Sequence, residues 1–400
     1  MLTHLRNLFH HPVGRAIGMT FLINGFVFGS WTSCIPFIKD KFSLNEAQLG
    51  LLLLSMPVGV LIMNPLTIYT LSRLGINRST VLFGSLFGAF FTLPVSANYL
   101  PFVVVGLFMA GCVFACQNVA MNTYASDLEE NHNMRLMSTC HGMWSLGAMS
   151  GALLASVSFG LLEKHLPSIS PPMIYFSGIA IITAGVTLLL RKNLNRIIVH
   201  AHEQPKGIKS SFSIFKPNAT LLLLASVLIC TYFTEGTMAD WSAVYMKDIL
   251  NSPEAIVGWG FSMYAGFMAG GRFIGDELIH RYTNMVVLRI GGVLVIMGMI
   301  WIIVASSAWI VLPGFVLVGL GISLASPILY GASAKVPGLA PGAGLATMNS
   351  FGMVAFLTGP VLVGFIAKIF DLRLAFLLVI VAAIIWIVQT SRLIRKKISM

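Results

Sequence analysis

The sequence predicts an all-α membrane protein with twelve transmembrane helices in two parallel six-helix repeats. Three observations support this fold class. The 400 residues are 56% hydrophobic and only 10% charged, with a mean hydropathy of +0.86, which lies outside the range of soluble globular domains. Apolar stretches of roughly 20 residues, long enough to cross a bilayer, recur along the whole chain. The second half of the chain also repeats features of the first.

The apolar stretches fall into two sets of six. Gly, Pro and isolated polar residues interrupt several of them, which membrane helices tolerate. The predicted helices span residues 13–37, 47–71, 78–97, 100–125, 137–161, 172–190, 219–247, 254–275, 283–305, 309–333, 341–367 and 371–391.

The distribution of basic residues predicts the orientation of the chain. We expect residues 1–190 and 218–400 to form two six-helix bundles, joined by a basic, polar linker at 191–217. Of the 25 Lys and Arg, 18 fall on the side of the two termini, six on the other side, and Arg289 lies inside the ninth helix. Because Lys and Arg accumulate in cytoplasmic loops, both termini and the linker are predicted to be cytoplasmic. The first helix has no clear cleavage site, so we expect it to be retained rather than removed as a signal peptide.

An internal repeat relates the two halves at an offset of 208 residues without a gap. The loop after the first helix carries the clearest match, which continues in several Gly and one Arg. The matched positions are Lys39-Asp40 with Lys247-Asp248, Glu46-Ala47 with Glu254-Ala255, Gly50 with Gly258, Arg73 with Arg281, Gly84 with Gly292, Gly106 with Gly314, Gly111 with Gly319, and Gly151 with Gly359. Both copies begin on the same side of the membrane, so the repeats are parallel. Helices 1 to 6 should superpose on 7 to 12, with His141 over Asn349.

Two acidic residues, Glu235 and Asp240, lie inside the seventh apolar stretch. An Asp at the centre of a membrane helix costs roughly 2.5 to 3.5 kcal/mol on insertion scales, so each acid needs a partner, water or a proton. Desolvation favours the neutral carboxyl group, so Glu235 is a candidate proton carrier; the alternative is a structural acid paired with another helix. No Lys or Arg is predicted at matching depth, which favours the first role. Asp240, about 140° further around the helix, fits an outer gate, a packing acid or a solute ligand.

Other polar and aromatic residues in the membrane are candidates for solute binding. Amide side chains offer donors and acceptors to hydroxyl or carboxylate groups of a solute, although interhelical hydrogen bonding is a competing use. An aromatic stripe is more often packing, but an Asn near mid-membrane favours a cavity. The candidates are Gln117, Asn118 and Asn122 in the fourth helix and Asn24, Phe28 and Trp31 on one face of the first.

His141 leads a face of the fifth helix that also carries Ser138, Trp144 and Ser145, and the repeat places Asn349 at the equivalent position. A single His in a helix is usually a packing residue, but this one is a candidate to relay a proton near neutral pH.

Several other classes of protein are not supported. The net charge of +11 does not indicate a nucleic-acid partner, because the Lys and Arg lie between apolar stretches rather than on one face. The five Cys lie in or beside apolar stretches, so no disulfide framework is expected. Cys112 with Cys116, Cys140 with His141, and 21 Met raise the alternative of a soft-metal transporter, but the spacing fits no closed site. We expect no metal, no cofactor and no enzymatic activity, since no phosphate-binding loop or nucleophile motif is visible.

Three stretches carry a resemblance to a known family: E-G-T-M-A-D-W from Glu235 to Trp241, C-H-G-M-W-S-L-G from Cys140 to Gly147, and G-G-R-F-I-G-D-E-L-I-H-R-Y from Gly270 to Tyr282. Over essentially its whole length the chain resembles the major facilitator superfamily. These stretches resemble little-characterised bacterial inner-membrane permeases near the fucose-permease branch.

The resemblance also concerns a gate. The family's cytoplasmic gating motif between helices 2 and 3 is degraded here, with Ser72 where the family has Asp, beside Arg73. The gating contacts are therefore expected to be rebuilt in the second repeat. The residues concerned are Arg272, Asp276, His280 and Arg281.

We expect a proton-coupled symporter that brings a small polar solute, sugar-like or an organic acid, into a bacterial cell by alternating access. The resemblance implies that helices 1, 4, 7 and 10 line a central cavity, where Trp31 and Trp241 are expected to stack on a ring. The expected partners are the solute, protons and the lipid bilayer of the inner membrane, with the chain as a monomer. The proton-coupling candidates are Glu235, Asp240 and His141; the solute-binding candidates are Asn24, Phe28, Trp31, Gln117, Asn118, Asn122, Trp144, Trp241 and Asn349.

Two rival functions stay open. A drug/proton antiporter of this family carries a Gly-Pro motif in helix 5, whereas helix 5 here has no Pro; Gly359-Pro360 in helix 11 keeps this alternative open. The second rival is a transporter-derived sensor that binds a solute without moving it.

Overall fold

The computed structural model describes residues 8, 10–132, 136–166, 170–196, 219–336 and 343–395. Within these ranges the chain is almost entirely helical, and no strand occurs. Eleven of the described helical segments are long and apolar enough to cross a membrane. The all-α membrane fold predicted from the sequence is confirmed.

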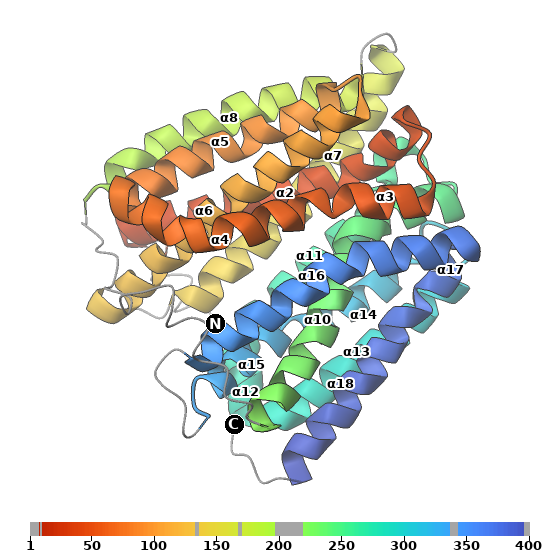
Figure 1. Cartoon of the computed structure of the whole chain (residues 1–400). Helices are drawn as coiled ribbons and strands as arrows, with labels where there is room; N and C mark the ends of the chain where they lie inside the picture. Colours follow the sequence, from red (N-terminus) through yellow and green to blue (C-terminus); the bar gives the residue numbers. More distant parts are fainter. Residues whose placement is uncertain are drawn as a thin grey trace.

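The first repeat supplies six spans (Figure 1). Its helices are α2 (Pro12–Lys41), α3 (Glu46–Leu53) with α4 (Ser55–Leu74), α5 (Ile76–Ser96), α6 (Leu100–His132), α7 (Met137–His165) and α8 (Pro171–Leu194). Local sequence signals begin several of them. Pro12 and Pro171 stand in the first turn of their helices, and a capping box between Asn45 and Gln48 starts α3. Gly75, with a φ of 81°, provides the left-handed turn between α4 and α5.

The second repeat supplies the other five, with α11 and α12 at the position of the predicted eighth span. Its helices are α10 (Ala219–Val244) with a π-helical turn (Tyr245–Ile249), a 3₁₀ turn (Glu254–Ile256), α11 (Trp259–Phe273) with α12 (Gly275–Arg281), α13 (Asn284–Val304), α14 (Leu312–Ile322) with α15 (Ala325–Ser333), α16 (Ala343–Ile369), α17 (Leu372–Ala375) and α18 (Leu377–Arg395). The predicted eighth span is interrupted at Ile274, which separates α11 from α12. The linker predicted at 191–217 falls mostly outside the described residues, and its first four residues continue α8.

The helices form two groups, α2–α8 and α10–α18, which lie side by side (Figure 1). In the first group α2 packs on α7, and α5 packs on both α6 and α8. In the second group α10 packs on α16 and α18, and α13 on α14 and α18. The groups meet mainly along two seams, α7 with α11 and α3 with α16.

Small residues allow α2 and α7 to approach closely. Gly25 and Gly29 are four residues apart on α2, and Gly147 and Gly151 are four apart on α7. A Cβ atom at any of these positions would collide with the main chain of the other helix. In a membrane, where lipid is as apolar as the side chains, such close backbone packing is a main source of helix association.

The 208-residue repeat is also visible in the packing. Gly111 rests against the Met56 carbonyl, and the equivalent Gly319 rests against the Tyr264 carbonyl. At the seams, Gly50 packs against the Pro360 carbonyl. A Cβ atom built at the equivalent Gly258 would lie 2.6 Å from the Ala152 carbonyl oxygen. Each partner is itself displaced by 208 residues, so the offset relates contacts in space. The superposition of His141 on Asn349 and of Arg73 on Arg281 stays a prediction.

Candidate functional site

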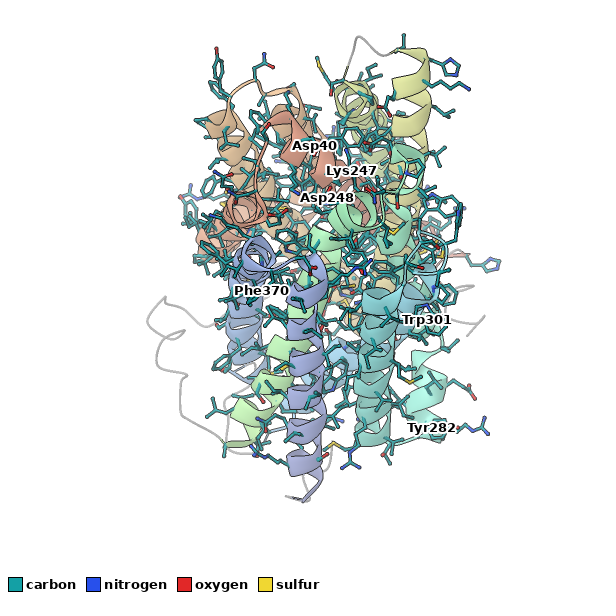
Figure 2. All side chains as sticks on the ribbon, turned by 90° about the vertical axis from the view of Figure 1, so that its right-hand side faces the viewer. Asp40, Lys247, Asp248, Tyr282, Trp301 and Phe370 are labelled. Carbon is teal, nitrogen blue, oxygen red and sulfur yellow. The ribbon has the colours of Figure 1, made fainter. Side chains whose placement is uncertain are left out.

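Ion pairs join the two repeats near the ends of α2 and α10. Lys39 pairs with Asp248 and, at 3.0 Å, with Glu46. Lys247 pairs with Asp40 and with Glu254, each at 2.6 Å. Figure 2 shows Asp40, Lys247 and Asp248 close together where the two groups of helices meet. We call Lys39, Asp40, Glu46, Lys247, Asp248 and Glu254 the ion-pair cluster.

The ion-pair cluster follows the repeat. The pair Lys39 with Asp248 becomes Lys247 with Asp40 when each number is shifted by 208. The sequence revealed the repeated Lys-Asp and Glu, but not that each repeat pairs with the other. Burial raises the pKa of the Glu254 carboxyl group, and the Lys247 ammonium opposes that rise. Glu254 therefore takes up a proton at a higher pH than an exposed Glu.

Glu235 lies on α10, half-buried. Within the described residues it makes neither a hydrogen bond nor an ion pair, but it lies within electrostatic range of Arg272. The expectation that no Lys or Arg lies at matching depth is therefore wrong. Arg272 is near the end of its own helix in the sequence, yet its side chain extends toward the interior where α7 and α11 meet.

Arg272 joins the two repeats. One terminal guanidinium nitrogen donates to the Ser145 hydroxyl at 2.6 Å and to the His141 carbonyl at 3.4 Å. The buried Nε has no partner among the described residues. The Ser138 hydroxyl in turn donates to the Arg272 carbonyl at 3.3 Å. Arg272 therefore makes interhelical contacts that leave part of its donor capacity free.

Three tyrosines that the sequence analysis did not select surround Glu235. Tyr232, Tyr264 and Tyr330 all lie within electrostatic range of its carboxyl group. The hydroxyls of Tyr232 and Tyr330 are 3.1 Å apart, and Tyr330 donates to Asn349 Oδ1 at 2.8 Å. Tyr264, only 1% exposed, has a hydroxyl without a partner among the described residues. The position of Tyr232, one helical turn before Glu235, is the signal that could have identified it.

Asn24 and Trp144 form the facing polar contact in the first repeat. Trp144 Nε1 donates to Asn24 Oδ1 at 2.8 Å, and the buried Asn24 Nδ2 has no partner among the described residues. The Phe28 ring lies 5.5 Å from Trp144 and 6.5 Å from Phe261 of α11. Phe261 is 5.7 Å from Tyr264, so an aromatic wall runs from α2 to the second repeat. The sequence thus correctly placed Asn24 and Phe28 on one face, and the structure adds Trp144 to it.

The three amide side chains of α6 have different surroundings. Asn122 Nδ2 donates to Asn118 Oδ1 at 2.6 Å and to the Asn118 carbonyl at 2.8 Å, and both residues are half-buried. Gln117 is 1% exposed and packs beside Gly84 of α5, 3.0 Å from a Cβ at that position. Asn118 and Asn122 therefore stay candidates for solute contact, whereas Gln117 packs within its own repeat.

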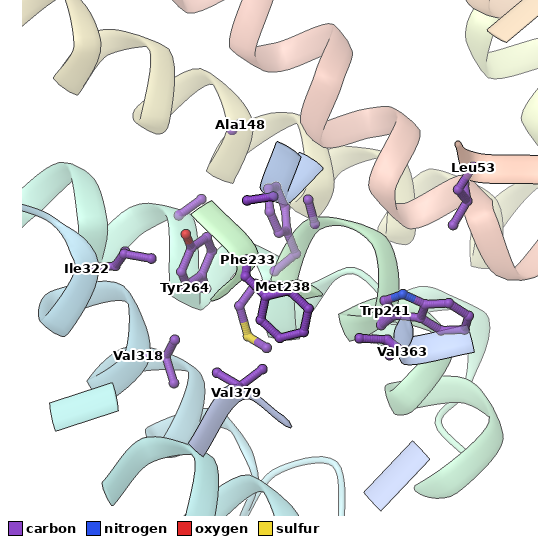
Figure 3. Close-up of a cluster of buried hydrophobic side chains, with 14 of the residues drawn as sticks. Leu53, Ala148, Phe233, Met238, Trp241, Tyr264, Val318, Ile322, Val363 and Val379 are labelled. Atoms are coloured by element: carbon purple, nitrogen blue, oxygen red, sulfur yellow. The ribbon is translucent and has the colours of Figure 1, made fainter. Parts of the chain in front are cut away.

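The two tryptophans expected to stack on a solute ring are packed in the core. Trp31 is 3% exposed and stacks on Phe91 of α5 with ring centroids 5.2 Å apart. Trp241 is fully buried beside Gly364 of α16. Figure 3 shows Trp241 with Val363, in the buried cluster that also holds Phe233, Met238 and Tyr264. Both rings pack against other side chains in this structure, and their stacking on a solute stays a prediction.

The remaining coupling candidates are in different surroundings. The His141 ring packs edge-on against Phe21 at 5.4 Å, and its carbonyl accepts the bond from Arg272. Asp240 is half-buried and has no hydrogen bond or ion pair to the rest of the described chain. Both stay predictions.

Among the described gating side chains, no hydrogen bond, ion pair or ring contact joins one to another. Arg73 is exposed and stacks on Tyr69 of its own helix at 5.1 Å, and Arg281 stacks on Tyr282 at 5.8 Å. His280 is exposed and forms no ion pair with an acidic side chain among the described residues. The side chain of Asp276 lies outside the described part of the structure. Arg272 itself bonds to Ser145 and His141 of α7, and its pairing with Asp276 stays a prediction.

Comparison with known proteins gives a consistent result. The sequence matches the Major Facilitator Superfamily over residues 17–341. It is 28% identical to the uncharacterized transporter y4wD of Sinorhizobium fredii, covering 91% of this chain and 94% of that protein. It is 29% identical to an uncharacterized MFS-type transporter of Yersinia pestis, covering 90% of each.

Solved structures share the fold at low sequence identity. A bacterial homologue of the human lysosomal transporter Spinster, in an inward-facing conformation, matches with a TM-score of 0.71 at 15% identity, covering 96% of this chain and 97% of that one. The transporter FucP, in an outward conformation, matches with a TM-score of 0.64 at 16% identity, covering 94% and 97%.

Proposed function

Because the chain belongs to the Major Facilitator Superfamily and is a multi-pass membrane transporter rather than an enzyme, we propose that it couples the uptake of a small polar solute to a proton by alternating access. We place it in the bacterial inner membrane with both termini in the cytoplasm, on the distribution of Lys and Arg.

The observation that carries the proposal is the setting of Glu235. Its carboxyl group lies on a membrane helix, in a polar cluster with Arg272 and the hydroxyls of Tyr232, Tyr264 and Tyr330, and has no ion-pair partner within 4.0 Å among the described residues. Burial in a membrane protein disfavours a charged carboxylate, whereas Arg272 favours it. A carboxyl group held between these opposing effects can change its protonation state when its access to water changes.

The polar cluster of Glu235 is connected to both repeats. Tyr232, Tyr330 and Asn349 belong to the second repeat, and Arg272 is bonded to Ser145 and His141 of the first. Relative motion of the repeats would therefore change the surroundings of Glu235 and of any solute bound beside it. This supports coupling of the proton and the solute at one site.

Among the described residues, no contact favours the antiporter alternative. Pro360 of α16 packs against Gly50 of α3, where the two repeats meet. A Cβ atom built at Gly359 would have Phe233, at 3.8 Å, as its neighbour. That contact accounts for these residues as packing.

Accumulation in proteoliposomes tests the proposal. A thermal-shift screen of sugars, organic acids and cationic drugs first identifies a solute that stabilises the protein, since a ligand of the folded state raises its apparent stability. With one proton per solute, a gradient of one pH unit can drive roughly tenfold accumulation. Glu235→Gln should exchange labelled solute across the membrane but fail to accumulate it, whereas Glu163→Gln, at an exposed acid of α7, should accumulate it normally.

Two outcomes would contradict the proposal. Gradient-driven accumulation at the wild-type level in Glu235→Gln would remove this residue from coupling. Expulsion of the solute in exchange for protons would support an antiporter instead.

A further inference from the structure

We propose that the solute is an anion, a small organic acid whose carboxylate is held by Arg272 at the interface of the two repeats. This inference rests on the proposed function, because it names the substrate class of the same site.

Arg272 has the charge and the donors needed to bind a carboxylate. Its guanidinium carries a permanent positive charge and five N–H donors arranged to grip a carboxylate at two points. Among the described residues, its N–H donors reach only a hydroxyl and a carbonyl, on Ser145 and His141. No carboxylate lies within ion-pair distance of it among the described residues, and Nε is buried without a partner. A partly buried charge in this state can accept an anionic partner.

Two further buried side chains, Tyr264 and Asn24, have hydrogen-bond donors without a partner among the described residues. Tyr264, 1% exposed, keeps a free hydroxyl and lies within electrostatic range of both Arg272 and Glu235. Asn24, 2% exposed, keeps a free Nδ2 while its Oδ1 is taken by Trp144. With Arg272 Nε, these are groups that can donate a hydrogen bond. Buried hydrogen-bond donors normally have an acceptor as partner. A ligand rich in acceptor atoms would supply the missing partners.

Hydrogen bonds and aromatic contacts link Asn24, Tyr264 and Arg272 to one another. Trp144 is bonded to Asn24 and adjacent in sequence to Ser145, which accepts from Arg272. On the other side, the aromatic wall leads from Trp144 through Phe28 and Phe261 to Tyr264. The donors of Asn24 and Tyr264 thus lie at the two ends of one chain of aromatic contacts. A carboxylate beside an apolar or hydroxylated body fits this arrangement.

Electrostatics favours the same assignment. Among the described residues, a neutral solute would leave Glu235, which is beyond ion-pair distance, as the counter-ion of Arg272, and protonation of Glu235 during transport would remove that charge. An anion entering together with the proton restores the balance, because the carboxylate replaces the lost charge of Glu235. Hydrogen bonds to charged groups contribute more to stability than those between neutral groups, so the gain is largest for a carboxylate.

Matched pairs of compounds test the proposal. The probes are D-gluconate and D-glucitol, L-lactate and 1,2-propanediol, and benzoate and benzyl alcohol, each pair differing in a carboxylate against a hydroxymethyl group. Binding to the purified full-length protein is followed by thermal shift and by titration calorimetry. An acid should stabilise the protein at concentrations where its matched alcohol does not.

Three variants locate the binding group. Arg272→Gln should weaken binding of the acid at least tenfold, and Arg272→Lys should recover only part of the affinity because the two-point grip is lost. Tyr264→Phe should also weaken acid binding, without lowering the thermal stability of the free protein, since it removes a buried hydroxyl that has no partner. Arg289→Gln is the control, because Arg289 also lies in a membrane helix and donates to a hydroxyl, that of Ser391, at 3.0 Å.

The outcomes separate this inference from the proposed function. Stabilisation by the alcohols equal to that by the acids, or acid binding unchanged in Arg272→Gln, would overturn the anion assignment. Glu235-dependent accumulation of D-glucitol would overturn it too, while proton coupling would stand. If acid binding depends on Arg272 but no gradient-driven accumulation occurs, the anion assignment would stand and proton coupling would be overturned.

Discussion

The bond between Asn24 and Trp144 is the best-defined polar contact of the proposed site. It satisfies one oxygen of an Asn that is 2% exposed. A buried acceptor left without a donor costs about 1 to 3 kcal/mol. This contact therefore holds the α2 and α7 side chains in place before any solute binds.

Trp144→Phe should therefore lower the thermal stability of the protein. The Phe keeps a ring near Phe28 but leaves Asn24 Oδ1 without its donor, with an expected loss of about 1 to 2 kcal/mol. Thermal unfolding in detergent measures the effect. The double variant Asn24→Leu with Trp144→Phe should recover part of the loss, and simple additivity of the two single changes would argue against this contact.

At the same scale, the sequence could predict candidates but not their partners. Asn24, Phe28 and Trp31 share a helical face by spacing. Yet Trp31, a turn further along α2, meets Phe91 of α5 instead of α7. Periodicity gives the direction of a side chain around its own helix, whereas its partner depends on which neighbouring helix lies at that depth. The role of Arg272 was missed for the same reason.

Helix packing makes the strongest demand on single glycines. Gly151 of α7 meets the Phe26 carbonyl of α2, whereas Gly178 of α8 has open space where a side chain would begin. Gly151→Leu should prevent correct packing of the first repeat, and Gly178→Leu should be tolerated. The yield of monodisperse protein after size-exclusion chromatography measures both. Equal yields from the two variants would show that the close approach of α2 and α7 is dispensable.

The ion-pair cluster connects the two repeats near the ends of α2 and α10. Its charges should therefore influence the distance between the repeats at that end. Reversing one charge with Lys39→Asp places like charges together and should favour separation at that end. Restoring opposite charges with Lys39→Asp and Asp248→Lys should bring the ends together again. Both residues are partly exposed, so the effect should weaken at high salt.

Spin labels can follow this separation. In a cysteine-free background, labels at the exposed Tyr99 and Phe370 report the distance between the repeats at this end by pulsed electron resonance. The single reversal should add a longer-distance population and the double variant should remove it. A distance distribution that ignores both changes would show that the ion-pair cluster does not hold the repeats together.

For the whole molecule, the fold followed from the sequence more fully than the site did. Twelve apolar stretches and the 208-residue offset are properties of the chain alone, and they predict the two six-helix repeats. The way the repeats meet is not such a property. The repeated Lys-Asp pairs show this well, since their reciprocal pairing appears only when one repeat lies against the other.

The orientation of the whole molecule is testable without a solute. Reporter fusions at residue 205 should be active only in the cytoplasm, because the Lys and Arg flanking that position favour the inner side. Fusions at position 167, which lies between α7 and α8 in the sequence, should report the outer side. The opposite pattern would invert the topology and place the ion-pair cluster on the inner side.

The central claim is that Glu235 carries the proton that accompanies the solute. The most direct measurement is proton flux: adding the identified solute outside proteoliposomes without an imposed gradient and recording external pH with an impermeant dye. Wild-type protein should make the external medium more alkaline in proportion to solute uptake, and Glu163→Gln should do the same. Glu235→Gln should show no solute-dependent change in pH while still exchanging labelled solute. Alkalinisation at the wild-type rate in Glu235→Gln would contradict the claim.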